Sequence, residues 1–349
     1  MHIEEEGLPI VGVIGAGSFG TAISNLLSLN ARVLLYSRNA DLVEKINRTH
    51  RHMDMELSDR IRATGSLQEV AETCTLIFPV VPSANFRDMM RELSPFLRPY
   101  HLLIHGTKGF DVRRKPEEPE DGPITREHVC TMSEVIRQES VVVRVGCLSG
   151  PNLAREIMAG QPTATVIASR FDEVIEKGKK VLSSRFFQVL SSHEMVGAEL
   201  AGALKNVVAV GSGILGGLGM GKNIQAILIT QGLMEMIRFG SVMGGGPEAF
   251  LGTAGIGDLI ATATSTQSRN YSFGLRLGRG ETVEQITDSI SEVAEGVRTV
   301  LIAKQLADHY KLDVPITQTL YRIIYEGADI FEAIEALIRF PGEADVDFM

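Results

Sequence analysis

A β-branched run that ends in a glycine turn constrains this chain more than any other feature of its sequence. Residues 10–14 (IVGVI) are typical of a short buried strand, and Gly15 follows directly. Residues 18–29 then have the pattern of a helix, and residues 33–36 (VLLY) that of a second strand. A strand, a turn, a helix and a strand within about thirty residues predict a βαβ unit, whose strands pair in parallel through a right-handed crossover.

The turn itself reads GAGSFG at residues 15–20, a G-x-G-x-x-G motif between the expected strand and the expected helix. In that context Gly15 makes the tight turn, Gly17 lets the backbone approach a pyrophosphate, and Gly20 allows close packing of the helix. A diphosphate would then lie against N–H groups at the positive end of the helix. The motif predicts a dinucleotide site, with a purely structural glycine turn as the alternative.

The end of the second expected strand bears on the choice of dinucleotide. Ser37 and Arg38 stand where an NAD site usually carries Asp or Glu for the ribose hydroxyls. A carboxylate would repel the 2′-phosphate of NADP, whereas Arg38 and the Ser37 hydroxyl can bind it. We expect NADP or NAD as cofactor, with NADPH favoured. A solvated charge at the end of a strand is the alternative interpretation of Arg38.

Strand and helix patterns alternate through the first half of the chain. Helical stretches separate most of the further strand candidates, which are residues 75–81, 101–105, 141–145 and 163–168. From residue 196 onward strand signals vanish, and the chain has helical patterns to about residue 338. We predict an α/β fold, with a Rossmann-like, doubly wound, mostly parallel sheet in residues 1–195 and an all-α domain in residues 196–349.

Residues 111–127 interrupt this alternation. Their central part, 113–123 (RRKPEEPEDGP), is charged and rich in proline and has no apolar periodicity. Such a composition does not bury enough apolar surface to order itself strongly. We expect an exposed loop inserted in the first domain, with partner binding as the alternative.

Bulk composition excludes several classes of function. The chain has 349 residues, of which 44% are apolar and 22% charged, so two domains can fold without disulfides or metals. The formal net charge of −9 argues against nucleic acid or a membrane surface as partner. Cys74, Cys130 and Cys147 form neither a disulfide framework nor a metal-binding pattern, and we expect no metal.

Two segments bear on localisation. An acidic run at residues 4–6 stands where a secretory signal would carry basic residues, so the cytoplasm is the expected compartment. Residues 206–221 are apolar and rich in glycine, but a membrane span needs about twenty residues with fewer glycines. We expect a buried core helix and a loop there, and no membrane span.

Lys205 is the most informative residue outside the glycine turn, because it lies in the apolar helical segment 199–210 (ELAGALKNVVAV). Its helical neighbours are uncharged and mostly small: Ala201, Gly202, Val208 and Ala209. Small residues leave room for a ligand, and desolvation or a nearby cation would lower the lysine pKa toward neutrality, where it can exchange protons. A lysine that snorkels to the surface is the alternative.

A second polar cluster follows further along the chain. Asp258 is followed one turn later by Thr262, and then by the polar run 264–270 (TSTQSRN). This run has the pattern of a loop leading into a helix, with Ser268 as candidate N-cap. A helix N-terminus with the Arg269 fork beside it would bind phosphate well. An ordinary capped helix is the alternative.

Taken together, several segments resemble NAD(P)-dependent glycerol-3-phosphate dehydrogenase of the bacterial and eukaryotic cytosolic type. The resemblance runs from about residue 10 to about residue 327. In chain order the matching segments are GAGSFG (15–20), VVPS (80–83), TKG (107–109), SGPNLAREI (149–157), ELAGALKNVVAV (199–210), AGIGDL (254–259), QSRN (267–270) and VAEGVRT (293–299).

The resemblance implies an oxidoreductase that interconverts sn-glycerol 3-phosphate and dihydroxyacetone phosphate by hydride transfer with NAD(P)(H), feeding glycerophospholipid synthesis. It also implies a homodimer. Lys205 would be the proton acceptor, Lys108 would lie near substrate and nicotinamide, and Asp258 and Thr262 would orient the substrate and Lys205.

The same resemblance implies two sets of binding residues. The substrate set is Lys108, Gly150, Asn152, Lys205, Asp258, Ser268, Arg269 and Asn270. The cofactor set is Gly15, Gly17, Ser18, Phe19, Gly20, Arg38, Lys108, Ala154, Arg269, Val293 and Glu295. The sequence departs from the family at Asn152, where Ser or Thr is usual, and in the inserted 111–127 loop.

Two other functions compete with this one. Another NADP-dependent β-hydroxyacid dehydrogenase would have an asparagine several residues after its lysine, whereas Lys205 and Asn206 are adjacent here. A non-catalytic dinucleotide sensor would have no need to retain the polar residues Lys108, Lys205, Asp258 and Arg269.

Overall fold

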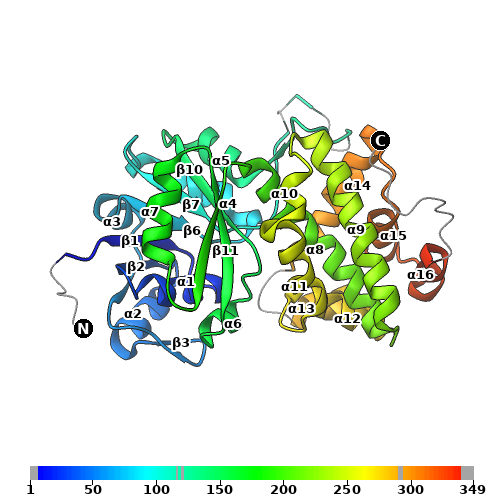
Figure 1. Ribbon diagram of the computed structural model, residues 1–349, viewed down its shortest axis with the longest axis horizontal. Coiled ribbons are helices and arrows are strands. Elements are labelled where there is room, and N and C mark those ends of the chain that lie inside the picture. The colour runs from blue at the N-terminus through cyan, green and yellow to red at the C-terminus, as the bar shows by residue number, and fades with distance from the viewer. Residues whose placement is uncertain (1–6, 115–116, 119–121, 290–293, 339–349) are drawn as a thin grey trace. The chain divides into compact units, whose positions relative to one another are not determined.

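The computed structural model describes residues 7–114, 117–118, 122–289 and 294–338 of the chain. The chain divides into two compact units (Figure 1). The first comprises residues 1–107 and 131–195, and the second comprises residues 108–130 and 196–349.

The first unit is built on an eight-stranded sheet of order β12-β11-β10-β7-β6-β1-β2-β5. Every neighbouring pair is parallel except β10 with β11, which confirms the predicted mostly parallel α/β fold. The strands are β1 (Ile10–Ile14), β2 (Arg32–Tyr36), β5 (Ile61–Thr64), β6 (Leu76–Pro79), β7 (Leu102–His105), β10 (Arg144–Ser149), β11 (Thr163–Ser169) and β12 (Phe187–Ser192).

Three strands differ from the expected ones. The strand expected at 141–145 begins only at Arg144, because Val141 and Val143 are exposed and the buried stretch starts at Val145. The edge strands β5 and β12 were not predicted from the sequence. Both mix polar residues into a short apolar pattern, which conceals a strand of four to six residues in the sequence.

The helices of the first unit pack against this sheet or against one another (Figure 1). They are α1 (Ser18–Leu27), α2 (Ala40–Thr49), α3 (Leu67–Thr73), α4 (Ser83–Leu93), α5 (Met132–Glu139), α6 (Ala154–Met158) and α7 (Asp172–Leu182). A short hairpin of β3 (Arg51–His52) and β4 (Met55–Glu56) follows α2. The core gathers apolar residues from strands and helices, such as Val13, Ile23 and Phe78, none of which is exposed.

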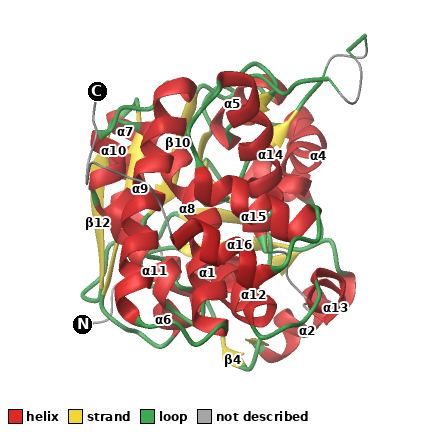
Figure 2. Cartoon of the chain, turned by 90° about the vertical axis from the view of Figure 1, so that its right-hand side faces the viewer, coloured by secondary structure: helices red, strands yellow, loops and turns green. Residues whose placement is uncertain are grey.

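The second unit is mostly helical (Figure 2). Its helices are α8 (Met195–Gly217), α9 (Lys222–Met243), α10 (Glu248–Leu251), α11 (Asp258–Thr264), α12 (Arg269–Gly278), α13 (Val283–Ser289), α14 (Glu295–Tyr310), α15 (Pro315–Tyr325) and α16 (Ile330–Ile338). A single π-helical turn, Thr253–Gly257, leads into α11.

Glycines bring α8 and α12 into backbone contact. A Cβ on Gly213 of α8 would lie 2.1 Å from the Tyr271 carbonyl oxygen, and one on Gly274 of α12 would lie 2.0 Å from that of Val210. No larger residue fits at either position without moving a backbone. This packing fixes α12 beside the C-terminal part of α8.

Within the part of the chain that the structure describes, two helices are long and apolar enough to cross a membrane, judged by length and composition alone. They are α8 and α9, and 89% and 44% of their apolar windows are buried inside the protein. A core helix of a globular protein passes the same test. The buried residues of α8 fit the core helix that was predicted for this segment.

The loop expected at residues 111–127 of the first domain lies within residues 108–130, which group with the helical unit. Phe110, Ile124 and Val129 are buried in the core of that unit. Strand β8 (Asp111–Val112) pairs in antiparallel fashion with β9 (Val129–Cys130). The charged residues in the centre of the segment dominate its composition, so the apolar residues that are buried at its two ends were not recognised from the sequence.

Candidate active site

Lys205 lies in the middle of α8 and is only 4% exposed. The partners that its own helix does not provide come from α11. The Lys205 ammonium donates a hydrogen bond to the Thr262 hydroxyl, with 2.7 Å between Nζ and Oγ1, and another to Oδ1 of Asp258. Asp258 and Thr262 stand four residues apart on α11, so both face the same way. The buried amine is therefore held by a carboxylate and a hydroxyl.

The second carboxylate oxygen of Asp258 binds another lysine. Lys108 donates from Nζ to Oδ2 at 2.6 Å, and its side chain is 19% exposed. Asp258 is 1% exposed, so one buried carboxylate bridges two ammonium groups. We refer to Lys108, Lys205, Asp258 and Thr262 as the lysine cluster.

Burial and charge set the protonation of this cluster. Burial lowers the pKa of Lys205 to about 7, the Asp258 carboxylate opposes that shift, and the Lys108 ammonium adds to it. For Asp258 burial alone would raise the pKa, but the two lysines outweigh it and hold the pKa below its usual value. Lys205 is thus poised to gain and lose a proton near neutral pH beside a permanent anion.

Two amide side chains tie the cluster to neighbouring segments. Asn206 donates from Nδ2 to the backbone oxygen of Lys108 at 3.2 Å, and Asn270 donates to Oδ1 of Asn206 at 2.8 Å. Oδ1 of Asn270 in turn accepts from the backbone N–H of Gly296 at 2.8 Å, in the first turn of α14. This amide relay fixes the backbone from which Lys108 reaches Asp258.

The predicted phosphate site lies at the start of α12. Ser268 is its N-cap and accepts from the Tyr271 N–H at 3.3 Å, which confirms the capping expected from the sequence. Arg269 is the exposed first residue of the helix, while Asn270 is buried in the amide relay. Glu295 is the first residue of α14, and Val293 lies outside the described residues.

The glycine turn of the first unit has the shape that a dinucleotide requires. Gly15 has φ of +116°, a conformation that favours glycine. A Cβ on Gly20 would lie 1.8 Å from the Gly15 oxygen, so the turn and α1 pack without space for a side chain. Gly17 is the N-cap residue of α1, and Ser18 and Phe19 open the helix. The backbone N–H groups at this helix start fit a diphosphate.

The other predicted residues of the first unit occupy strand ends and turns. Arg38 is exposed two residues after β2, and the Ser37 hydroxyl accepts from the Asn39 N–H at 3.2 Å. Gly150 follows β10 with φ of +134°, and Ala154 is the first residue of α6. Asn152 donates to the Thr165 hydroxyl at 2.9 Å, while its Oδ1 is buried without a hydrogen-bond partner.

Comparison with known proteins places this geometry in a family. The family model described as NAD-dependent glycerol-3-phosphate dehydrogenase N-terminus matches residues 10–175, and the one described as its C-terminus matches residues 194–335. The chain belongs to this family. The finding confirms the resemblance drawn from the motifs and does not favour the two alternative functions.

Individual relatives agree with the family models. Glycerol-3-phosphate dehydrogenase [NAD(P)+] from Teredinibacter turnerae is 37% identical over 97% of this chain and 96% of its own length. The enzyme of that name from Acinetobacter baumannii is also 37% identical, over 97% and 92%. The crystal structure of glycerol-3-phosphate dehydrogenase from Coxiella burnetii has a TM-score of 0.85 at 32% identity and covers 95% of this chain and 99% of that one.

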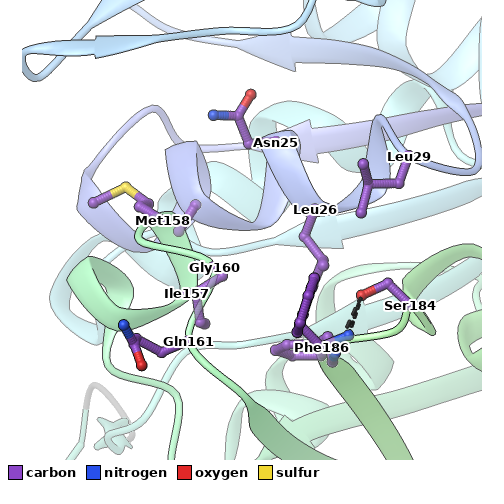
Figure 3. Close-up of a pocket in the computed structure, with 11 residues that line it drawn as sticks. Asn25, Leu26, Leu29, Ile157, Met158, Gly160, Gln161, Ser184 and Phe186 are labelled. Carbon is purple, nitrogen blue, oxygen red and sulfur yellow. Dashed lines mark hydrogen bonds between the residues drawn. The ribbon is translucent and has the colours of Figure 1, made fainter.

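The family motifs named all four residues of the lysine cluster but did not indicate Asn206 as the residue that holds the backbone of Lys108. The available signal was a polar residue next to Lys205 in an otherwise apolar helix. A pocket between α1, α6 and the start of β12 was also not predicted (Figure 3). Leu26, Ile157 and Phe186 are among its lining residues, and it includes none of the residues predicted for this dehydrogenase's substrate or cofactor.

Replacing Asp258 by asparagine should destabilise the protein strongly. Asp258→Asn keeps the shape of the side chain but leaves two ammonium groups beside a neutral amide, at a cost of about 3 kcal/mol. The change is measured as the shift of the urea unfolding midpoint. Thr262→Val, which removes only the hydroxyl, should cost about 1 kcal/mol.

The matched control for this prediction is Lys205→Met in the Asp258→Asn background, which removes one of the uncompensated cations. The double variant should be more stable than the sum of the two single effects indicates. Strictly additive effects, or a wild-type midpoint for Asp258→Asn, would show that the carboxylate does not hold the two lysines.

Proposed function

We infer that this chain catalyses the interconversion of sn-glycerol 3-phosphate and dihydroxyacetone phosphate with NAD(P)(H). The observation that carries the proposal is the lysine cluster, in which a buried amine with a pKa of about 7 stands beside a second cation in a chain of this family. When bound, the nicotinamide supplies or accepts the hydride.

The lysine cluster provides the proton chemistry that such a reaction needs. In the oxidation, neutral Lys205 would accept the proton of the C2 hydroxyl. In the reduction, its ammonium would polarise the C2 ketone and return the proton. The Lys108 ammonium would stabilise negative charge that develops on the C2 oxygen. Asp258 and Thr262 hold the Lys205 amine in one position, so little reorganisation is required as the proton moves.

The phosphate group of the substrate is proposed to bind at the start of α12. Ser268 caps that helix, and the exposed Arg269 offers a planar fork of donors. Asn270, held in the amide relay, and the turn residues Gly150 and Asn152 complete the proposed substrate set with the lysine cluster. The buried, unpartnered Oδ1 of Asn152 is an acceptor that a substrate hydroxyl could satisfy.

The dinucleotide is proposed to lie along the glycine turn. Gly15, Gly17, Ser18, Phe19 and Gly20 would hold its diphosphate. The remaining proposed contacts are Arg38, Lys108, Ala154, Arg269, Val293 and Glu295. Arg38 is exposed and stands where a carboxylate would select NAD, which supports a preference for NADPH.

We further propose a cytoplasmic homodimer that feeds glycerophospholipid synthesis. The net charge of −9 supports the absence of nucleic-acid and membrane-surface partners. The depth at which α8 is buried supports the absence of a membrane span. No metal is needed for a hydride transfer assisted by two lysines, and the proposal contains none.

Removing the Lys205 amine should abolish turnover while cofactor binding persists. Lys205→Ala should lower kcat for dihydroxyacetone phosphate reduction by about 100-fold or more, because the proton donor is lost. NADPH binding, followed by fluorescence titration, should stay close to that of the wild type. The control is Lys222→Ala, an exposed lysine at the start of α9. Near-wild-type turnover of Lys205→Ala would remove Lys205 from the mechanism.

The two directions should respond oppositely to pH. Oxidation requires the neutral amine, so kcat/KM for glycerol 3-phosphate should rise as the pH passes about 7, where Lys205 loses its proton. Reduction requires the ammonium, so kcat/KM for dihydroxyacetone phosphate should fall over the same interval. Initial rates in one buffer series test this. If kcat/KM for the two substrates changed in the same direction with pH, the ionisation that controls the rates would belong to a group other than Lys205.

The identity of residue 38 should decide cofactor preference. Arg38→Asp introduces the carboxylate that repels a 2′-phosphate, so kcat/KM for NADPH should fall about tenfold or more while that for NADH changes little. Side-by-side initial rates with the two cofactors measure the effect. Arg32→Asp, at the exposed start of the same strand, is the control. Equal losses with both cofactors would contradict a 2′-phosphate contact.

A further inference from the structure

The β3–β4 hairpin has an unusual backbone for its sequence. Among the described residues, four that are not glycine have positive φ. Met53 (51°) and Asp54 (59°) form the turn of this hairpin, and His50 (46°), directly before it, is the C-cap of α2. A two-residue hairpin turn favours positive φ at both of its positions, although methionine rarely occupies one. The turn brings His52 and its neighbours into a tight hairpin whose contacts can be followed one by one.

One of these contacts reaches the glycine turn. The His52 ring nitrogen Nε2 lies 2.8 Å from the backbone oxygen of Ala16, the residue between the first two glycines of the motif. A carbonyl only accepts, so Nε2 carries the hydrogen and donates. The neutral ring with its hydrogen on Nε2 and the imidazolium both meet this requirement, so the hydrogen bond does not depend on the charge of His52.

The hairpin is also fastened to α1 independently of His52. Asn25 of α1 donates from Nδ2 to the Glu56 oxygen at 3.2 Å and accepts from the Ser58 N–H at 3.2 Å. The Leu57 N–H closes the hairpin by donating to the His50 oxygen at 2.7 Å. The hairpin thus stays docked on the helix that follows the glycine turn, even without the histidine.

The hydrogen bond from His52 also determines the direction of the next backbone N–H, that of Gly17. All described peptide bonds are trans, and in a trans peptide the C=O of one residue and the N–H of the next point in opposite directions. Holding the Ala16 oxygen toward the hairpin therefore turns the Gly17 N–H away from it. Gly17 is the N-cap residue of α1, so this N–H belongs to the group that the proposed function assigns to the cofactor diphosphate.

We propose that His52 is a positioning residue for the dinucleotide, which fixes the Ala16–Gly17 peptide so that its N–H is already aimed at the diphosphate. This inference rests on the proposed function. His52 touches only the far side of the peptide and not the cofactor itself. Since the diphosphate is common to NADH and NADPH, the effect of His52 is equal for both, unlike that of Arg38.

The test compares three variants of the full-length protein. His52→Phe keeps a ring but removes the donor, and His52→Gln offers an amide donor at similar reach. Met53→Ala alters the same turn at an exposed residue that makes no polar side-chain contact. For each we measure KM and Kd for NADH and NADPH, KM for dihydroxyacetone phosphate, kcat, and the thermal unfolding midpoint.

We expect His52→Phe to raise Kd and KM for both cofactors by about 3- to 10-fold, the effect of one lost hydrogen bond. Its kcat at saturating cofactor and its KM for dihydroxyacetone phosphate should stay at wild-type values. His52→Gln should recover most of the cofactor affinity, and Met53→Ala should bind as the wild type does. A merely structural histidine would lower the unfolding midpoint of His52→Phe and leave cofactor affinity unchanged.

Three results overturn the inference. The first is unchanged cofactor affinity in His52→Phe. The second is a loss of affinity for NADPH alone, which would indicate a 2′-phosphate contact. The third is a failure of His52→Gln to restore cofactor binding although this variant folds. In each of them the wild type still reduces dihydroxyacetone phosphate, so the proposed function stands. A wild type that binds neither cofactor would instead refute the proposed function, and the inference with it.

Discussion

The candidate site of the helical unit depends on one interaction, that of the buried Asp258 carboxylate with two lysine amines. The carboxylate lies between the two amines, and the three groups carry one more positive than negative charge when both amines are protonated. Burial of the Lys205 amine lowers its pKa more than the Asp258 carboxylate raises it, and the nearby Lys108 ammonium adds to the lowering. The reactivity of Lys205 therefore follows mainly from its removal from water, which the carboxylate only partly offsets. An anion formed beside the amines would complete the balance.

The placement of that carboxylate depends on close backbone packing. A Cβ on Gly255 in the π-helical turn would lie 2.1 Å from the Phe250 oxygen, so the chain enters α11 along a path that only glycine permits. The glycine contacts between α8 and α12 fix the neighbouring helix in the same way. The glycines of this unit therefore contribute to the burial of the lysine cluster, because backbones that pack this closely leave little room for water.

Local patterns in the sequence predicted local structure well. The strand at 10–14 is observed with those bounds. The small apolar neighbours of Lys205 made it a candidate buried amine, with a surface lysine as the alternative, and the structure shows it buried. The contacts that define the site were beyond such reasoning, since Lys108 and Asp258 are 150 residues apart. Only the order of family motifs related them. The assignment of residues 108–130 to the helical unit also depends on a few buried side chains, and charge between them hides the pattern.

The β3–β4 hairpin shows why some functional residues leave no trace in a sequence. The positive φ at Met53 could not be predicted, because methionine normally avoids that conformation. In the sequence, a histidine that donates to a backbone carbonyl looks like any other polar surface residue. Yet both units use the same device. Asn206 holds the backbone oxygen of Lys108, and His52 holds that of Ala16. In each case a side chain away from the proposed reactants fixes a peptide by its carbonyl, because a fixed peptide determines where the neighbouring donor points.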